Sequence, residues 1–151
     1  MEKIAVIGGG AAGMMASIFA ARRGMEVHVY EKNEKTGKKL YITGKGRCNL
    51  TNACDMEELL ESVKSNKKFL YSAFYGFTNQ DAYDFFEAEG LKLKVERGNR
   101  VFPMSDRSAD VLDTLRRAMR SAGVQVHLNT EVKSVRKQED GFTLQLADKT
   151  L

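Results

Sequence analysis

The chain has 151 residues, of which 42% are hydrophobic, so it is long enough for one domain of ordinary size and extended disorder is not expected. Two cysteines and two histidines are too few for a disulfide framework or a zinc site, which favours a reducing cytoplasm and predicts no metal. No apolar run reaches the roughly 18 residues of a membrane-spanning helix, so no membrane partner is expected. The net charge of +4 equals the excess of residues 31–47, which hold six basic and two acidic side chains.

The first 30 residues predict a strand, a helix and a second strand. Lys3 to Ile7 is expected to be a buried strand, residues 11–23 a helix that ends at Gly24, and Glu26 to Tyr30 the second strand. Residues 31–55 carry glycines, lysines and asparagines without a clear period. They are therefore interpreted as a long functional loop rather than an element.

The remainder predicts helices, strands and a closing hairpin. The hairpin has its turn at Asp140-Gly141, and ADKTL at 147–151 predicts a turn leading into a further strand, so we expect the chain to be a fragment. The mixed order of elements indicates an α/β fold with an antiparallel addition. The expected helices are 56–63, 67–77, 78–89 and 110–121, and the expected strands are 91–96, 100–103, 124–128, 131–137 and 142–146.

Aromatic residues are concentrated between positions 69 and 86. They have helical spacing, which more often marks a buried core than a platform on which nucleic-acid bases stack, so core is the expectation and stacking the alternative. The residues are Phe69, Tyr71, Phe74, Tyr75, Phe77, Tyr83, Phe85 and Phe86.

A glycine motif lies between the first strand and the first helix. In Gly8-x-Gly10-x-x-Gly13, the first glycine permits a tight turn, the second lets the backbone approach a pyrophosphate, and the third lets the helix pack closely on the strand. Glu31 follows at the end of the next strand, where its carboxylate can accept hydrogen bonds from ribose hydroxyls. This pattern predicts dinucleotide binding and disfavours NADP, whereas NAD and FAD both remain open.

The loop after Glu31 favours the larger of the two dinucleotides. An NAD site would be nearly complete at this point, yet the chain continues with EKTGKKLYITGKGRCNLTN. Its glycines allow close approach of the backbone, while Lys39, Arg47 and Asn49 supply donors for phosphate or for the carbonyl edge of a flavin. The lysine-rich stretch is otherwise interpreted as a solvated loop or as a local positive field for a polyanion.

Three blocks resemble the BaiN/RdsA-like flavoprotein family of FAD-dependent oxidoreductases. They are GGGAAGMMAS at 8–17, TGKGRCNLTN at 43–52 and GNRVFPMSDRSADVLDTL at 98–115. The resemblance implies a Rossmann-like FAD-binding domain of the glutathione-reductase type, with residues 1–151 as its N-terminal portion. It also implies an inserted second domain and a C-terminal flavin-binding segment beyond residue 151.

The same resemblance implies the cofactor contacts and the reaction. The glycine turn would hold the pyrophosphate, Glu31 the adenosine ribose, residues 46–49 the flavin side, and the backbone of Val132 the adenine. NADH or NADPH would drive reduction of an activated C=C bond in a small molecule or in an RNA base, and no catalytic residue is assigned. The candidate cofactor-binding residues are Gly8, Gly10, Ala11, Ala12, Gly13, Glu31, Lys32, Lys39, Gly46, Arg47, Cys48, Asn49 and Val132.

Two other functions are weighed against this flavoenzyme. A disulfide reductase would use Cys48 and Cys54, but five residues intervene where such enzymes have four on a helix, so Cys48 is expected to be a small packing residue beside the flavin. The other alternative is a dinucleotide-binding module or fragment without turnover. His28 and His127 have no partner arrangement typical of a hydrolase and are expected to be packed strand residues.

Overall fold

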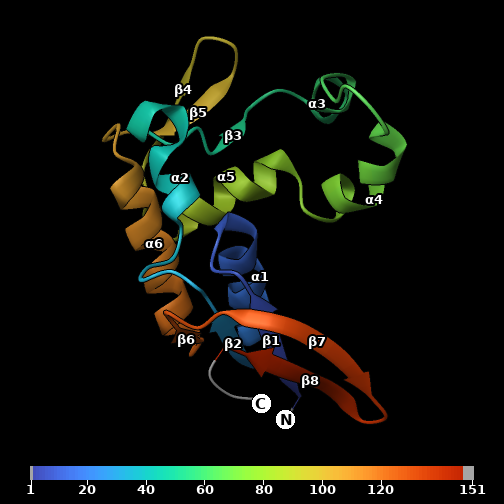
Figure 1. The fold of residues 1–151 in the computed structure, drawn as a ribbon. Coiled ribbons are helices and arrows are strands. Elements are labelled where there is room, and N and C mark those ends of the chain that lie inside the picture. The colour runs from blue at the N-terminus through green and yellow to red at the C-terminus, as the bar shows by residue number, and fades with distance from the viewer. Residues whose placement is uncertain (1, 148–151) are drawn as a thin grey trace. The chain divides into compact units, whose positions relative to one another are not determined.

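The computed structural model describes residues 2–147, which form two compact units (Figure 1). The first unit consists of Met1–Leu40 and Leu115–Leu151, and the second of Tyr41–Thr114. The strand predicted to follow ADKTL lies outside the described residues. No helix in residues 2–147 has the length and apolar character needed to cross a lipid bilayer.

The first unit contains a three-stranded parallel sheet in the order β1-β2-β6. Lys3 pairs with Glu26 at the start of the β1–β2 ladder, and His28 pairs with Gln125 at the start of the β2–β6 ladder. The predicted α/β fold with a parallel sheet and an antiparallel hairpin is confirmed. The elements of this unit are β1 (Lys3–Ile7), α1 (Ala11–Arg22), β2 (Glu26–Tyr30), β6 (Gln125–His127), β7 (Val132–Gln138) and β8 (Gly141–Leu146).

Side chains on both faces of β2 are buried, and those on one face pack against the β7–β8 hairpin. Val27 and Val29 share one face and are buried, because successive side chains of a strand alternate between the two sides of a sheet. On the other face Tyr30 forms a buried cluster with Leu144 and Leu146 of the β7–β8 hairpin. The hairpin therefore covers the end of β2 at which Glu31 emerges.

The prediction that β1 is a buried strand is wrong for the described residues. Lys3, Ala5 and Ile7 are exposed, and 53% of the surface of Ile7 is accessible. In the described sheet β1 pairs with β2 alone, so one edge of the strand has no neighbour. An apolar run indicates a strand that can be buried, but burial itself depends on segments elsewhere in the chain.

The second unit contains a three-stranded antiparallel sheet in the order β3-β5-β4. A capping box is present at Thr78, and the Thr78 hydroxyl accepts a hydrogen bond from the main-chain N–H of Asp81. The elements are a 3-10 helix η1 (Thr43–Gly46), β3 (Thr51–Asn52), α3 (Met56–Glu61), α4 (Lys67–Gly76), α5 (Asn79–Ala88), β4 (Leu93–Glu96) and β5 (Arg100–Pro103).

Two helices lie across the boundary between the units as defined above. The first is α2 (Lys38–Ile42), and the second is α6 (Ser108–Ser121). The latter helix has a buried apolar stripe, which consists of Val111, Leu112, Leu115, Ala118 and Met119. This amphipathic arrangement agrees with the helix expected at residues 110–121.

The expectation that the aromatic segment is core holds for α5 but not for α4. Phe85 and Phe86 of α5 are buried and meet edge to face, with ring centroids 5.2 Å apart. By contrast, α4 has no buried residue, and Phe69 and Tyr75 are 84% and 64% exposed. Helical spacing therefore marks a common face without telling which segment covers it.

The interpretation of residues 31–55 as a loop without elements is corrected by α2, η1 and β3, which are all short. Helices of four or five residues are too short to establish a sequence period, so periodicity does not detect them. Five residues of this segment have left-handed backbone conformations, with φ of 76° at Gly37, 55° at Gly44, 57° at Lys45, 83° at Gly46 and 61° at Cys48. The segment is a sharply folded connection and not an extended one.

Candidate functional site

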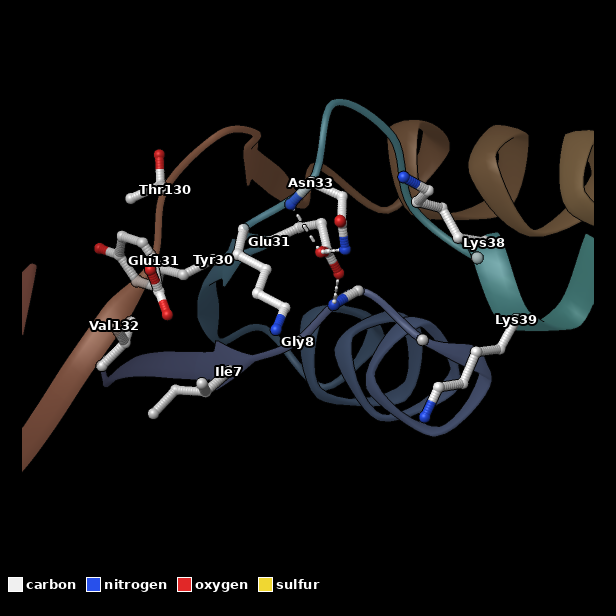
Figure 2. A pocket seen from close by; sticks show the side chains of 14 residues that line it. Ile7, Gly8, Tyr30, Glu31, Asn33, Lys38, Lys39, Thr130, Glu131 and Val132 are labelled. Atoms are coloured by element: carbon white, nitrogen blue, oxygen red, sulfur yellow. Dashed lines mark hydrogen bonds between the residues drawn. The ribbon is translucent and has the colours of Figure 1, made fainter. Parts of the chain in front are cut away.

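A pocket of about 440 Å³ lies in the first unit, where β1 and β2 end (Figure 2). Carboxyl ends of parallel strands are the usual ligand sites of open α/β sheets, because the loops that follow the strands diverge there. The lining residues are Ile7, Gly8, Gly9, Gly10, Tyr30, Glu31, Lys32, Asn33, Gly37, Lys38, Lys39, Thr130, Glu131 and Val132.

Two glycines of the motif have the mechanical roles predicted for them. Gly8 has φ of 95°, a left-handed conformation that allows the tight turn after β1. A β-carbon on Gly13 would lie 2.0 Å from the Gly8 carbonyl oxygen and 3.3 Å from a methyl group of Val6. Gly13 therefore allows α1 to begin in contact with the strand and turn that precede it.

Gly10 faces open space instead. A β-carbon at this position would have no heavy atom within 4 Å, although Gly10 lines the pocket. Gly10 is also the N-cap of α1, and no side chain caps this end of the helix. The first N–H groups of a helix have no partners within the helix, so the turn at Ala11 and Ala12 offers donors and a partial positive charge. This arrangement suits a phosphate group.

The carboxylate of Glu31 is held by three donors from within the first unit. Its Oε2 accepts from the main-chain N–H of Gly9 at 2.8 Å, and its Oε1 accepts from the main-chain N–H and side-chain amide of Asn33 at 2.8 and 2.6 Å. Burial alone would raise the pKa of Glu31, but the hydrogen bonds from Asn33 and Gly9 outweigh it and lower the pKa. Glu31 is therefore a buried, charged acceptor at neutral pH.

Three lysines of the lysine-rich stretch at residues 31–47 line the same pocket. Lys32 and Lys39 are exposed, and Lys38 donates to Glu34 at 3.2 Å. Glu131 also lines the pocket, and a hydrogen bond from Lys133, together with the charges of Lys133 and Lys32, lowers its pKa. Exposed ammonium groups near a helix N-terminus add attraction for a phosphate without fixing its orientation.

The predicted flavin-side loop belongs to the second unit, where Arg47 is the centre of an ion-pair network. Its guanidinium donates to both oxygens of Glu96 at 2.9 and 2.8 Å and to Asp106 at 3.0 Å, and it lies 4.0 Å from the ring centroid of Phe102. Lys94 donates to Asp106 at 2.6 Å. These contacts anchor the loop to β4 and β5, while a contact between Arg47 and a cofactor stays a prediction.

The environments of the two cysteines are unfavourable for a reactive pair. Cys48 is 3% exposed, and burial raises the pKa of its thiol more than a hydrogen bond from Thr43 lowers it. Burial and the charge of Glu58 raise the pKa of Cys54. Redox-active cysteines instead have lowered pKa values because the thiolate is the nucleophile. The packing role predicted for Cys48 agrees with its burial.

The structure brings six of the predicted residues around one pocket. They are Gly8, Gly10, Glu31, Lys32, Lys39 and Val132. Ala11, Ala12 and Gly13 follow in the first turn of α1, and Gly46, Arg47, Cys48 and Asn49 lie in the second unit. The first unit alone thus builds the described pocket.

The two residues that donate hydrogen bonds to the Glu31 carboxylate, Gly9 and Asn33, were not predicted as site residues from the sequence. A β-carbon on Gly9 would lie 2.7 Å from the methyl group of Thr36 and 3.2 Å from Glu31 Oε2. The absence of a side chain at Gly9 therefore leaves room for the carboxylate beside the turn. The run of three glycines at 8–10 was its only signal. The sequence contains no signal that marks Asn33 as a site residue, because asparagine is common in turns.

Comparison with known proteins assigns the chain to a family. The family model described as the HI0933-like protein Rossmann domain matches residues 2–151. The chain belongs to the HI0933-like family. The match agrees with the parallel sheet, the glycine turn and the helix that follows it.

Two relatives that are similar in sequence extend this comparison. The chain is 34% identical over 146 residues to the 3-dehydro-bile acid delta(4,6)-reductase of Clostridium scindens and to the ribosomal RNA dihydrouridine synthase of Escherichia coli. These alignments cover 95% and 97% of this chain but 35% and 36% of the relatives, so the chain spans about a third of their length.

Solved structures agree with the fold. THI4 of Thermovibrio ammonificans superposes with a TM-score of 0.63 at 12% identity, covering 96% of this chain and 46% of that protein. At this identity the likeness concerns the fold alone. It confirms that the predicted elements assemble in a Rossmann-like arrangement.

Proposed function

We propose that this chain is the FAD-binding N-terminal portion of an oxidoreductase that uses NADH or NADPH to reduce an activated C=C bond. The observation that carries the proposal is the buried Glu31 carboxylate beside the open face of Gly10. The carboxylate suits a ribose hydroxyl, and the helix N-terminus next to Gly10 suits a pyrophosphate. An adenosine diphosphate group contains both chemical features.

Each part of the pocket would hold a stated part of the cofactor. Gly8, Gly10 and the first turn of α1 would bind the pyrophosphate, and Glu31 would bind the ribose. Val132 would meet the adenine, and residues 46–49 would contact the flavin side. FAD, when bound, supplies transfer of a hydride equivalent from the nicotinamide to the electron-poor carbon of the substrate. The chain's own part is to bind and orient that cofactor.

The names of the two relatives support the reaction class, and they leave two substrate classes open, a small molecule and an RNA base. One relative is named for reduction of a bile acid at the delta(4,6) position, and the other for dihydrouridine synthesis in ribosomal RNA. Both names describe saturation of a C=C bond. We extend that reaction class to this protein, with a small molecule or an RNA base as substrate. We also propose the cytoplasm as its location and an inserted domain and a C-terminal segment as its remaining parts.

Nucleotide titration tests the cofactor assignment. The purified chain is titrated with FAD, ADP and FMN, with binding followed by calorimetry and by quenching of flavin fluorescence. We expect FAD and ADP to bind and FMN to bind at least about tenfold more weakly, because FMN lacks the adenosine that Glu31 would recognise. Glu31→Gln should weaken FAD and ADP alike. Equal binding of FMN and FAD would contradict the assignment.

Turnover separates the oxidoreductase from a nucleotide-binding module. The FAD-loaded chain is mixed with NADH or NADPH and either a steroid enone or a uridine-containing RNA, and nicotinamide absorbance is recorded. Oxidation that depends on one acceptor supports the enzyme and selects its substrate class. FAD binding without acceptor-dependent oxidation by the protein carrying its further domains would support the module.

A further inference from the structure

Asn33 makes two hydrogen bonds to a single oxygen of Glu31. Its side-chain amide and its main-chain N–H donate to Oε1 at 2.6 and 2.8 Å, while Oε2 accepts from Gly9 (Figure 2). A carboxylate offers about four acceptor positions, so these three donors leave about one for a ligand. The orientation of the carboxylate, and hence the direction of that free position, depends on Asn33 and Gly9.

Asn33 is itself held by the segment that follows β6. Its carbonyl oxygen accepts from the main-chain N–H of Asn129 at 3.0 Å, and Asn129 has the left-handed φ of 51° that asparagine tolerates well. Glu31 donates its main-chain N–H to His127 and accepts from Thr130, both at 2.9 Å. The backbones that carry the carboxylate and the amide are thus fixed to the same segment.

We infer that Asn33 is a positioning residue that sets the Glu31 carboxylate for a ribose hydroxyl of an adenine nucleotide. The inference rests on the proposed function, because the ribose is part of the proposed cofactor. A neutral amide suits this role because it donates strongly to the carboxylate without forming an ion pair with it, so the carboxylate keeps its capacity to accept from a ligand. A lysine in this place would compete with the ribose as a charged partner.

Deoxynucleotides test the inference because they remove the hydroxyl that Glu31 would recognise. The chain and its variants are titrated with ADP, 2′-deoxy-ADP and 3′-deoxy-ADP. We expect the wild type to prefer ADP over one of the deoxy forms by about tenfold or more, as for a hydrogen bond to a charged acceptor. In Asn33→Ala this preference should fall to about twofold, with ADP weakened and that deoxy form nearly unchanged.

Three further variants separate positioning from other roles. Asn33→Gln retains an amide and should restore part of the preference for ADP. Asn33→Asp sets two carboxylates against each other, so ADP should bind weakly at neutral pH and more tightly as the pH falls. Lys39→Ala, at another residue that lines the pocket, should weaken ADP and the deoxy forms by the same factor, because an ammonium group near the phosphates does not sense the ribose hydroxyl.

The outcomes distinguish the inference from the function on which it rests. Undiminished preference for ADP in a folded Asn33→Ala variant overturns the positioning role. Equal weakening of ADP and the deoxy forms in that variant also overturns it, because it would mean that Asn33 acts on the phosphates or on the fold. If the wild type binds neither ADP nor FAD, the proposed function fails as well, and the inference fails with it.

Discussion

Gly13 faces the carbonyl oxygen of Gly8 so closely that a β-carbon on Gly13 would lie 2.0 Å from that oxygen. The two residues belong to one motif, yet the contact concerns folding and not a ligand. Gly10, between them in the chain, faces open space at the pocket. The motif therefore combines a glycine that the fold requires with a glycine that only a ligand would require.

We expect Gly13→Ala to destabilise the first unit and Gly10→Ala to spare it. A methyl group on Gly13 clashes with backbone, and overpacking of this kind costs about 1–3 kcal/mol or more. Gly10 has φ of −77°, which any residue adopts, so alanine there should cost less than about 1 kcal/mol of unfolding free energy while reducing FAD affinity about tenfold or more. Urea unfolding and flavin titration of both variants provide the measurement. Normal FAD binding by Gly10→Ala would argue against a phosphate at this turn.

The ion pair between Arg47 and Glu96 should make the stability of the second unit depend on pH. Hydrogen bonds from Arg47 lower the pKa of Glu96 from 4.5 to about 2. A carboxyl group whose pKa is lower in the folded state stabilises the protein fully above its unfolded-state pKa, and this contribution is lost as the pH falls through the folded-state pKa. We therefore expect the stability advantage of the wild type over Glu96→Gln to be constant above about pH 5 and to shrink towards pH 2.

Denaturant unfolding at a series of pH values measures this difference. Arg47→Lys is the matched variant, because it keeps the charge but loses the two-pronged contact with the carboxylate. Its stability should lie between those of the wild type and Glu96→Gln. A difference between wild type and Glu96→Gln that does not change from about pH 6 to about pH 2.5 would show that the pair does not form in solution.

Thiol labelling should distinguish the two cysteines. Cys54 is partly exposed and Cys48 is buried, and both thiols have raised pKa values. We expect one thiol of the native chain to react slowly with a maleimide at neutral pH and both to react in denaturant. Cys54→Ala should abolish the native reaction, and Cys48→Ala should leave it. Formation of a Cys48–Cys54 disulfide under mild oxidation would revive the disulfide-reductase hypothesis.

The capping box of α5 should contribute measurably to stability. The main-chain N–H of Thr78 donates to the Asp81 carboxylate at 2.7 Å, and that of Asp81 donates to the Thr78 hydroxyl at 3.0 Å. Thr78→Ala should lower the free energy of unfolding by about 1 kcal/mol, while Thr78→Ser, which keeps the hydroxyl, should lower it much less. Urea denaturation of Thr78→Ala, of Asp81→Ala and of the double variant measures the coupling. Fully additive losses would mean that the two residues act independently.

Local signals in the sequence were sufficient for most elements and for half of the candidate site. The glycine motif and Glu31 converge on one pocket because strand, turn and helix are consecutive, and a turn of this kind brings its own residues together. Short elements such as α2 and η1 were not predicted, because four or five residues cannot establish a period. The exposed aromatics of α4 were not predicted for a different reason, which is that spacing defines a helix face but not its neighbour.

By itself, the sequence determined where the chain turns, which segments become helices and strands, and which residues meet at the end of β2. Only the tertiary structure decided that Asn33 and Gly9 hold Glu31, that Arg47 binds Glu96, and that β1 is exposed. The physical reason is the range of the interactions. Backbone conformation and apolar spacing act over a few neighbouring residues, whereas burial and hydrogen-bond partners depend on segments brought together from distant parts of the chain.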